Sequence, residues 1–406
     1  MRILLVTQYF WPESFPINDI VLGLKDEGHQ IEVLTGMPNY PGGRIFHGYS
    51  LSSPKHDSFE GVHVGRAPLI PRGNGAGWRL ALNFLSLAAS GCLLGPRRCP
   101  GPFDAILVYQ PSPVTIGLPA VRMKRKTGAP ILFWVQDLWP ETLAATGAVS
   151  SRIVLGWVGS MVRYIYRRCD LVLVQSEAFI GSIESHGVPR ERIKYLPNTA
   201  EALYRPVERR RALAEELGLP SGLRIMFAGN IGAAQDFPAI LGAATHLKEQ
   251  KDIHWLIVGD GRQRNWVEQE VEKRGLGGTF HLLGKHPKER MPEFFAHADV
   301  MLVTLKPEPI FALTIPSKVQ PYMACGKPIL AGLDGEGARV IRESGAGIAV
   351  PAGDSKELAE GVVAFHRMAE AERQAMGRKS REYFEAQFSR ERLLEKLQEW
   401  MAEVRT

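Results

Sequence analysis

The feature that most constrains the fold is a repeated alternation of short apolar segments with stretches of helical periodicity. The apolar segments are rich in Val, Ile and Leu and lack a period-two alternation, which is typical of parallel strands covered on both faces. Strand–helix–strand repetition favours right-handed crossovers and a doubly wound sheet. The sequence therefore predicts an α/β protein. The predicted strands are residues 3–8, 31–35, 62–66, 105–109, 131–135, 171–175 and 193–196, then 225–228, 254–258, 279–283, 300–305, 329–331 and 347–350.

The predicted strands fall into two groups, separated by a polar stretch after Pro197. A chain of 406 residues is long enough for two domains, each with its own core. We therefore expect two Rossmann-like domains, residues 1–200 and 201–384, that face each other across a cleft. Residues 385–406 are expected to form a last helix, capped by Ser389, that packs back on the first domain. Ligands of open α/β sheets bind at the carboxyl ends of the strands, so the turns after the strands are the candidate sites.

All of the excess positive charge lies in the first half. Residues 1–200 hold 20 Lys or Arg against 14 Asp or Glu, whereas residues 201–406 hold 29 of each, which accounts for the net charge of +6. This asymmetry suits an anionic surface or an anionic lipid-phosphate substrate, although a solvated basic face gives the same count. The basic clusters are Arg97-Arg98, residues 122–126, and Arg163 with Arg167 and Arg168.

The longest apolar segment, residues 80–95, bears on membrane attachment. It is shorter than a membrane span and contains polar side chains, so no transmembrane segment is expected. With Trp78 and Arg79 before it and Arg97-Arg98 after it, the segment fits either a helix on a bilayer surface or a buried helix of the first domain. Four cysteines without framework spacing, and no export-type N-terminus, favour a cytoplasmic chain, free or on the inner face of the plasma membrane.

Two turns of the second half are rich in glycine. Gly229, Asn230, Gly232 and Gln235 follow the strand 225–228, where glycines let backbone N–H groups approach a phosphate at a helix start. The same glycines also serve simply to tighten a turn. The turn at residues 259–261, Gly-Asp-Gly, follows the next strand and is more typical of a structural turn.

A third segment of the second half joins a proline to a cation. Thr314, Ser317, Lys318 and Gln320 flank Pro316, which fits the first position of a helix. Free N–H groups around Ser317 and Lys318, with one cation nearby, predict an anion site. A capped helix with an incidental lysine is the alternative.

In the first half, polar and aromatic residues follow three strands. Asp137, Trp139 and Glu141 lie at the end of the strand 131–135, where two carboxylates and a ring that could stack on a sugar favour a functional site. Aromatic residues at a strand end are also often plain core, which is the alternative. The loops after the first two strands are interpreted as acceptor-side loops, or alternatively as long structured turns. Their candidate contacts are Trp11, Glu13, Asn18, Asn39 and Tyr40.

Taken together, these segments resemble a known family. The two-domain plan, the turns at 229–232 and 259–261, and the Met-Ala-Cys-Gly-Lys-Pro segment at 323–328 are similar to GT-B glycosyltransferases of family 4. The resemblance is greatest to the L-fucosamine-transferase-like branch of O-antigen and capsule synthesis. That likeness rests on residues 8–13, 37–43, 137–141 and 316–318.

The resemblance implies a retaining transfer of a sugar from a nucleotide diphosphate sugar, without a metal or other cofactor. The donor is expected to be a UDP-sugar, carrying an N-acetylated hexosamine or deoxyhexosamine, and the acceptor a lipid-linked or free saccharide of surface polysaccharide synthesis. The second domain would bind the donor and the first the acceptor. By position, Gly229, Asn230, Gly232 and Gln235 would lie near the diphosphate, residues 314–318 would supply amides and a cation, and Lys285 would lie beside the base.

The chain departs from the family pattern at two places. Asn230 and Gln235 stand where the family commonly has Arg and Lys, and Leu313 and Pro321 stand where it commonly has two glutamates. Lys318 is therefore expected to stabilise the leaving diphosphate, while Asp137 or Glu141 orients or deprotonates the acceptor hydroxyl. Two side chains remain as candidates for the ribose contact, Gln320 and Glu336.

Two other functions stay open. A nucleotide-sugar 2-epimerase has the same two-domain plan and acts without an acceptor, but it needs acidic and His groups around the donor sugar, in which the second-half turns are poor. A non-enzymatic sugar-binding protein with a hinged cleft would bind a free sugar but not a nucleotide. Nucleic acid is not an expected partner.

Overall fold

The computed structural model describes residues 1–50 and 58–405. The chain divides into two compact units, which we call the first unit (Met1–Pro197 with Leu393–Thr406) and the second unit (Asn198–Arg392). The boundary predicted at 200/201 lies three residues after the division between the units, and the boundary predicted at 384/385 lies eight residues before the return to the first unit. The predicted ranges 1–200 and 385–406 also include residues 51–57 and 406, which lie outside the described part. The cleft expected between the units stays a prediction.

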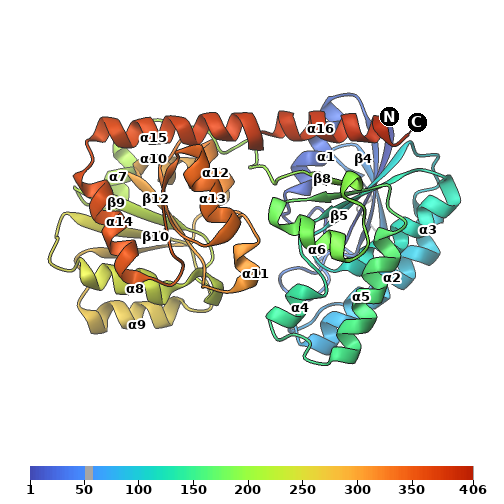
Figure 1. Cartoon of the computed structure of the whole chain (residues 1–406), viewed down its shortest axis with the longest axis horizontal. Helices are drawn as coiled ribbons and strands as arrows, with labels where there is room; N and C mark the ends of the chain where they lie inside the picture. The colour runs from blue at the N-terminus through green and yellow to red at the C-terminus, as the bar shows by residue number, and fades with distance from the viewer. Residues whose placement is uncertain (51–57, 406) are drawn as a thin grey trace. The chain divides into compact units, whose positions relative to one another are not determined.

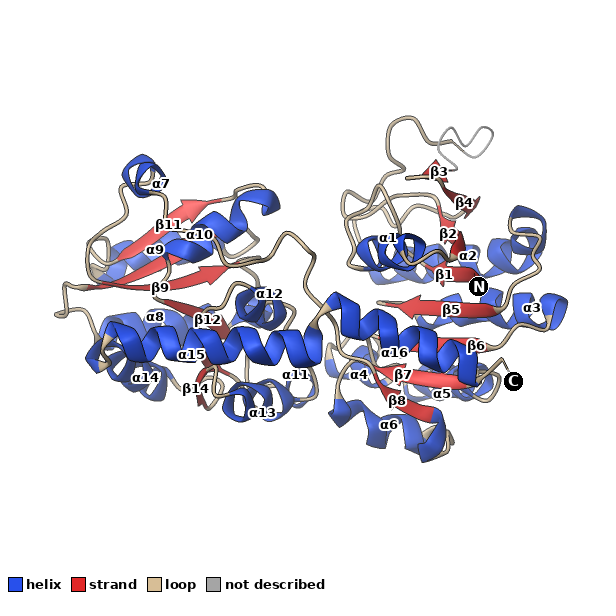
Figure 2. Cartoon of the chain, turned by 90° about the horizontal axis from the view of Figure 1, so that it is seen from above, coloured by secondary structure: helices blue, strands red, loops and turns tan. Residues whose placement is uncertain are grey.

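The first unit is built on a sheet of eight strands in its described residues, in the order β3-β4-β2-β1-β5-β6-β7-β8 (Figures 1 and 2). All neighbours pair in parallel except β3 with β4. The strand order reverses between β1 and β5, which makes that point the expected ligand crevice. The strands are β1 (Arg2–Thr7), β2 (Gln30–Gly36), β3 (Ser58–Phe59), β4 (Val62–Ala67), β5 (Ala105–Gln110), β6 (Ile131–Val135), β7 (Leu171–Val174) and β8 (Ile193–Tyr195).

Helices cover both faces of this sheet. One face carries α1 and α16 and the other carries α2, α3 and α5 (Figure 2). Because both faces are covered, the central strands are apolar throughout rather than alternating. The helices of the first unit are α1 (Ile17–Asp26), α2 (Gly77–Arg98), α3 (Gly117–Thr127), α4 (Glu141–Ala145), α5 (Arg152–Tyr166), α6 (Ile180–Ser185) and, from Leu393 onward, α16 (Arg390–Glu403).

The last helix belongs to the core of the first unit. Ser389 Oγ accepts a hydrogen bond from the backbone N–H of Arg392 at 3.3 Å, which is the cap expected from the sequence. The helical spacing of apolar residues places one stripe of α16 against α1 and the sheet. The buried residues of that stripe are Leu393, Leu394, Leu397 and Met401.

Helix α2 is longer than the apolar segment suggested. It has 22 residues, and among the described helices it alone is long and apolar enough to cross a membrane by length and composition. The segment was expected to be shorter than a membrane span, and that part of the expectation was wrong, because the helix extends past both ends of residues 80–95, from Gly77 to Arg98. That no segment crosses a membrane stays a prediction, since a buried or surface helix can have the same length and composition.

The second unit repeats the plan with a parallel sheet of six strands, in the order β11-β10-β9-β12-β13-β14. Its order reverses between β9 and β12. The strands are β9 (Leu223–Ala228), β10 (Ile253–Val258), β11 (Phe280–Gly284), β12 (Val300–Thr304), β13 (Ile329–Gly332) and β14 (Gly347–Val350). The helices are α7 (Arg211–Glu216), α8 (Phe237–His246), α9 (Arg264–Arg274), α10 (Met291–His297), α11 (Pro309–Ala312), α12 (Val319–Ala324), α13 (Gly335–Ser344), α14 (Ser355–Arg367) and α15 (Glu370–Tyr383).

Two cores lie on the two faces of this second sheet. Helices α8, α9 and α14 pack on one face, and α10, α12 and α13 pack on the other. The predicted α/β class with two doubly wound sheets is confirmed, and each predicted strand is present to within two residues at either end. The sequence did not reveal β3, because a two-residue strand is too short to show a periodic pattern.

Candidate functional site

The second sheet opens at its switch point. Strand β12 pairs with β9 only through Val300 and Met301, so the carboxyl ends of the two strands are not paired. The hydroxyl of Tyr322, from α12, fills the opening: Oη accepts from Ala228 N at 3.0 Å and donates to Ala228 O at 3.1 Å. The chain that follows β9 therefore begins beside a helix from a distant part of the sequence.

The two glycine turns interlock at this edge. Gly229 and Gly259 have φ of +145° and +141°, which other residues rarely adopt. A Cβ at Gly259 would lie 1.9 Å from Gly229 O, and a Cβ at Gly229 would lie 2.5 Å from Lys318 Cε. Both glycines are therefore required for the backbone and the lysine to approach so closely.

Lys318 brings a nearly isolated cation to the turn. Its Nζ donates a hydrogen bond to Gln235 Oε1 at 2.5 Å and lies 5.0 Å from the centre of the Phe227 ring. Burial lowers the pKa of Lys318 to about 8, and no carboxylate within the described residues pairs with it. A half-buried ammonium held by a neutral amide and an aromatic face is suited to bind an anion.

A cavity of about 500 Å³ opens beside these turns. It brings together the predicted phosphate turn, the Gly-Asp-Gly turn and the predicted base-side Lys285, all in the second unit. A cavity of this size is large enough for a nucleotide-sized ligand. The lining residues are Gly229, Asn230, Val258, Gly259, Asp260, Gly261, Lys285, His286, Lys288 and Met291.

The segment before α12 differs from the prediction. The helix begins at Val319, not at Pro316, and the Pro316 carbonyl accepts from the Val319 N–H at 2.9 Å. Ser317 is exposed in the turn before the helix, and Thr314 Oγ1 donates to Phe311 O. Proline at 316 forms a tight turn instead of a first helical position, so Lys318 reaches the site as the residue before the helix.

The two ribose candidates lie in different surroundings. Glu336 is buried and pairs with Arg339 one turn along α13, at 2.7 and 3.0 Å, so its carboxylate is already engaged. Gln320 is buried in α12 and its Nε2 has no hydrogen-bond partner. Gly232, the remaining predicted contact, is buried in the turn before Gln235.

In the first unit, the predicted acceptor loops hold one another. Glu13 Oε1 accepts from the backbone N–H groups of Asn39 and Tyr40, at 2.8 and 2.7 Å, and burial raises the pKa of Glu13 to about 7. Asn18 Nδ2 donates to Glu13 O, and Asn18 Oδ1 accepts from Trp11 N. Glu13, Asn18 and Asn39 thus position the loops, whereas Tyr40 is exposed.

Residues that the sequence analysis did not single out complete this loop network. The rings of Tyr9, Phe15 and Tyr40 lie 5.0–5.4 Å apart, and Arg72 lies 4.9 Å from the centre of the Tyr40 ring. Asn83, which is wholly buried in α2, accepts from Gln8 Nε2 at 3.0 Å and donates to Asn39 Oδ1 at 3.3 Å. Asn83 was noted only as an interruption of an apolar segment, although a polar residue on the inner face of a helix is itself a signal.

The pKa values of the two carboxylates after β6 shift in opposite directions. Burial raises the pKa of Asp137, whose oxygens accept from Thr142 Oγ1 at 2.6 Å and Trp139 Nε1 at 3.1 Å. Burial also acts to raise the pKa of Glu141, but hydrogen bonds to Oε1 from His186, at 3.1 Å, and from Ser182, at 2.8 Å, hold it below its usual value. The hydrogen bonds from His186 and Ser182 therefore favour the charged form of Glu141, whereas Asp137 fixes the Trp139 ring.

Four glutamines occupy equivalent places at the carboxyl ends of four adjacent strands. Gln110 ends β5, and Gln8, Gln136 and Gln175 follow β1, β6 and β7. Each has a buried side-chain atom without a hydrogen-bond partner, and Gln110 has two. Buried amides without partners are costly, which marks this edge as a place where a polar ligand would satisfy them. The sequence shows that Gln recurs at the ends of the strands. The strand order of the sheet was needed to show that these four strands are neighbours.

Comparison with known proteins identifies the family. Residues 17–199 match the family model described as "Glycosyl transferase 4-like domain", and residues 222–367 match "Glycosyl transferases group 1". The two models together span both units and both glycine turns. The chain belongs to the GT-B glycosyltransferases.

Relatives agree with this assignment. The glycosyltransferase is 26% identical over 341 residues to WcaI of Escherichia coli K12, named for colanic acid biosynthesis, covering 80% of this chain and 82% of WcaI. It is 31% identical over 234 residues to WbjE of Pseudomonas aeruginosa, named as a glycosyltransferase, covering 55% of this chain and 57% of WbjE. Anabaena HepE, solved with UDP, superposes with a TM-score of 0.72 at 16% identity over 99% of this chain and 100% of that one, which concerns the fold alone.

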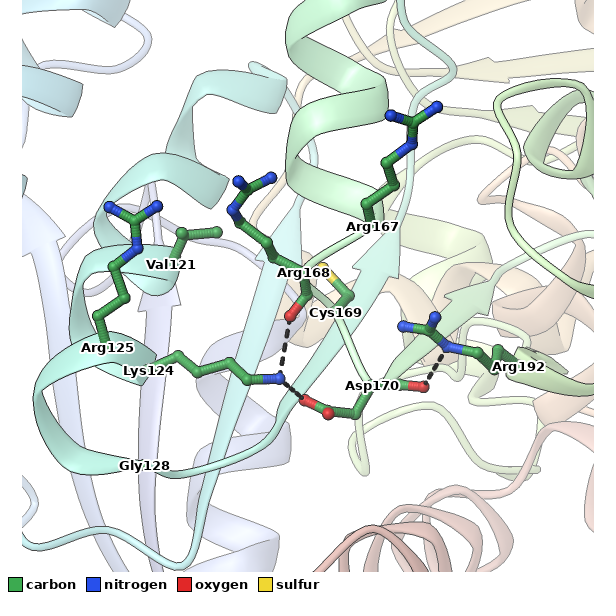
Figure 3. Close-up of a pocket in the computed structure, with 9 residues that line it drawn as sticks. All are labelled: Val121, Lys124, Arg125, Gly128, Arg167, Arg168, Cys169, Asp170 and Arg192. Carbon is green, nitrogen blue, oxygen red and sulfur yellow. Dashed lines mark hydrogen bonds and ion pairs between the residues drawn. The ribbon is translucent and has the colours of Figure 1, made fainter.

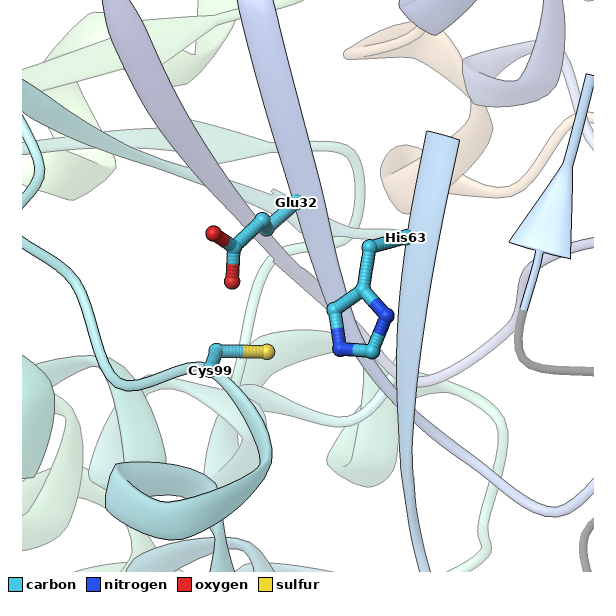
Figure 4. A group of neighbouring side chains, drawn as sticks. All are labelled: Glu32, His63 and Cys99. Carbon is cyan, nitrogen blue, oxygen red and sulfur yellow. The ribbon is translucent and has the colours of Figure 1, made fainter. Parts of the chain in front are cut away.

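Within residues 1–50 and 58–405, the glycosyltransferase also has one group of side chains with metal-ligating atoms close together. Glu32, His63 and Cys99 offer ligand atoms within 4.8 Å of one another (Figure 4). Glu32 already pairs with Arg2 at 2.5 Å, His63 Nε2 bonds the Arg98 carbonyl, and burial raises the pKa of Cys99 to about 12. A neutral thiol is a poor ligand, so this group does not by itself indicate a metal centre.

Proposed function

We propose that this glycosyltransferase binds a UDP-sugar at the carboxyl edge of the second sheet and transfers the sugar with retention to a saccharide acceptor. The observation that carries the proposal is Lys318, a half-buried cation without a carboxylate partner among the described residues, held against Gly229 beside the cavity of the second unit. HepE is described in complexes with UDP and with UDP-glucose, which supports a uridine donor here. The sugar is expected to be an N-acetylated hexosamine or deoxyhexosamine.

The chemistry follows from where charge develops. As the bond between the anomeric carbon and the phosphate oxygen breaks, the diphosphate gains negative charge, and a preorganised ammonium with nearby backbone N–H groups stabilises that charge most in the transition state. Lys318, Ser317, Thr314 and the 229–235 turn would supply these groups, with no metal required.

The acceptor side lies in the first unit. Glu141, whose charged form is favoured by its hydrogen bonds, would take the proton from the acceptor hydroxyl as the new glycosidic bond forms. Asp137 would act by fixing Trp139, whose ring would stack on a sugar face. WcaI and WcaL of Escherichia coli are both named for colanic acid biosynthesis, which supports a lipid-linked or free saccharide of a surface polysaccharide, such as an O-antigen, as the acceptor.

The test begins with the donor. A thermal-shift panel of UDP-, GDP- and dTDP-sugars should give the largest rise in melting temperature with a UDP-N-acetylhexosamine, because a ligand of the folded state stabilises it. Transfer should then proceed in excess EDTA. Strict dependence on a divalent ion would contradict the metal-free proposal.

The variant Lys318→Ala should lose about a hundredfold or more in kcat while remaining folded, since one preorganised oxyanion contact is removed. Lys251→Ala, an exposed lysine of the same unit, is the matched control and should retain activity. Near-normal turnover of Lys318→Ala would remove the lysine from the phosphate site. Conversion of the donor without any acceptor would favour the epimerase instead.

A further inference from the structure

Helix α2 is apolar on the side that faces away from its own sheet. Its inner face is built mostly from small residues, and a Cβ at Gly91 or Gly95 would lie 2.8 Å from Pro119 of α3 or Leu34 of β2. Its large apolar side chains point outward: Trp78 is 63% exposed, Leu85 56% and Leu93 75%. A helix that only closes a core has the opposite arrangement.

Helix α5, on the same face of the sheet, also exposes large apolar side chains. Gly159, Val162 and Ile165 face inward, whereas Ile153 is 70% exposed and Trp157 is 75% exposed. Helix α3 lies between the two, in contact with both. In Figure 1 the N-terminal ends of α2 and α5 lie at the same end of the first unit.

The layer is also free of acidic residues. Helices α2, α3 and α5 contain no Asp or Glu, and they carry three, four and two Lys or Arg, which makes nine. Helix α16, on the opposite face of the same sheet, carries four glutamates. The positive excess of the first half is therefore concentrated on the face that also exposes the apolar side chains.

The basic side chains gather at the other end of the layer. A cavity of about 420 Å³ lies between the C-terminal ends of α3 and α5, and the cations Lys124, Arg125, Arg167, Arg168 and Arg192 line it (Figure 3). Its single carboxylate, on Asp170, is already paired with Lys124 at 2.5 Å. Figure 3 shows that Arg125 and Arg167 extend away from Asp170, so that carboxylate neutralises neither guanidinium group. Arg125 Nη2 donates one hydrogen bond to the uncharged Tyr164 hydroxyl, at 3.1 Å.

We propose that the outer face of α2, α3 and α5 binds the surface of an anionic phospholipid bilayer. Trp78, Leu85, Ile153 and Trp157 enter the boundary between headgroups and acyl chains, and the basic ends of the helices bind lipid phosphates. A second copy of this chain is a poorer occupant, because a symmetric contact would set the same uncompensated arginines against each other. The proposal does not depend on the donor or acceptor proposed above.

The test is co-sedimentation of the whole protein with vesicles. Wild type should bind phosphatidylcholine vesicles that contain about one third phosphatidylglycerol, bind pure phosphatidylcholine far more weakly, and be released by high salt. The double variant I153S/W157S and the double variant R97E/R167E should each weaken binding by about tenfold or more. The matched controls, W266S and R211E, change an exposed tryptophan and an exposed arginine of the second unit and should bind like wild type.

Three results would overturn the proposal. The first is equal loss of binding in the matched controls, and the second is no difference between anionic and neutral vesicles. The third is a dimer in sedimentation equilibrium that W157S abolishes, with no vesicle binding, which would assign the face to a second copy.

Release of the native protein from membranes by alkaline carbonate is expected, whereas resistance to it would indicate that α2 crosses the bilayer. Donor-induced thermal shifts should be the same in all variants, which keeps this test separate from that of the proposed function.

Discussion

At the scale of single residues, the site is marked by polar groups that the fold leaves without a full set of partners. Lys318 is a cation without a carboxylate, Gln110 has no partner for either side-chain atom, and Gln320 has an unpartnered amide. Such groups cost stability in the free protein. Ligand binding would recover that cost, which is why these residues are better indicators of function than the well-satisfied Glu13 or Asn39.

Lys318 should therefore weaken the free protein. Its folded pKa, about 8, lies below the usual 10.5, so the unfolded chain binds the proton more tightly and stability rises with pH between these values. Lys318→Met should raise the melting temperature at pH 7. The difference in free energy of unfolding between the variant and wild type should shrink between pH 8 and pH 10.5. Urea titrations of both proteins across this range would check it. A constant difference would mean that the lysine is not desolvated.

Gln110 offers a test of the glutamine row. Gln110→Met keeps the volume and removes two unpartnered buried atoms, so stability should stay the same or rise by about 1 kcal/mol. If a polar acceptor uses the amide, the acceptor KM should rise while donor binding is unchanged. Loss of stability together with unchanged kinetics would show that the amide serves the fold.

At the scale of elements, the strand–turn–helix connection after β9 depends on one backbone conformation. Gly229→Ala places a methyl group at a φ of +145° and 2.5 Å from Lys318 Cε, so the lysine must move. We expect a loss of about 1–2 kcal/mol and a donor-induced thermal shift that is largely lost. Gly218→Ala is the matched control, because Gly218 also has positive φ but an open surrounding, and it should keep donor binding. Equal donor binding in both variants would contradict the close approach.

At the scale of the whole chain, the first unit is completed by its far end. Residues 393–405 contribute four buried side chains to the core that begins at Ile3. Leu397→Ala should cost about 2–5 kcal/mol in the unfolding of the first unit, whereas Glu399→Ala on the exposed side of the same helix should cost little. Chemical denaturation followed by circular dichroism would measure both. A negligible effect of Leu397→Ala would mean that the first unit does not need α16.

The sequence by itself determined the strands, the two sheets, the capped last helix and the glycine turns, because apolar periodicity and turn residues are local properties of the chain. Only the tertiary structure decided that α12 begins at Val319, that Lys318 contacts Gly229 and Gln235, and that Glu336 is engaged by Arg339. These contacts join residues up to 89 positions apart, from Gly229 to Lys318. The sequence likewise did not determine which side of α2 faces the sheet. An apolar segment of this length has the same composition whether its tryptophan and leucines face the core or the solvent. The close packing of Gly91 and Gly95 against Pro119 and Leu34 decides which side faces inward.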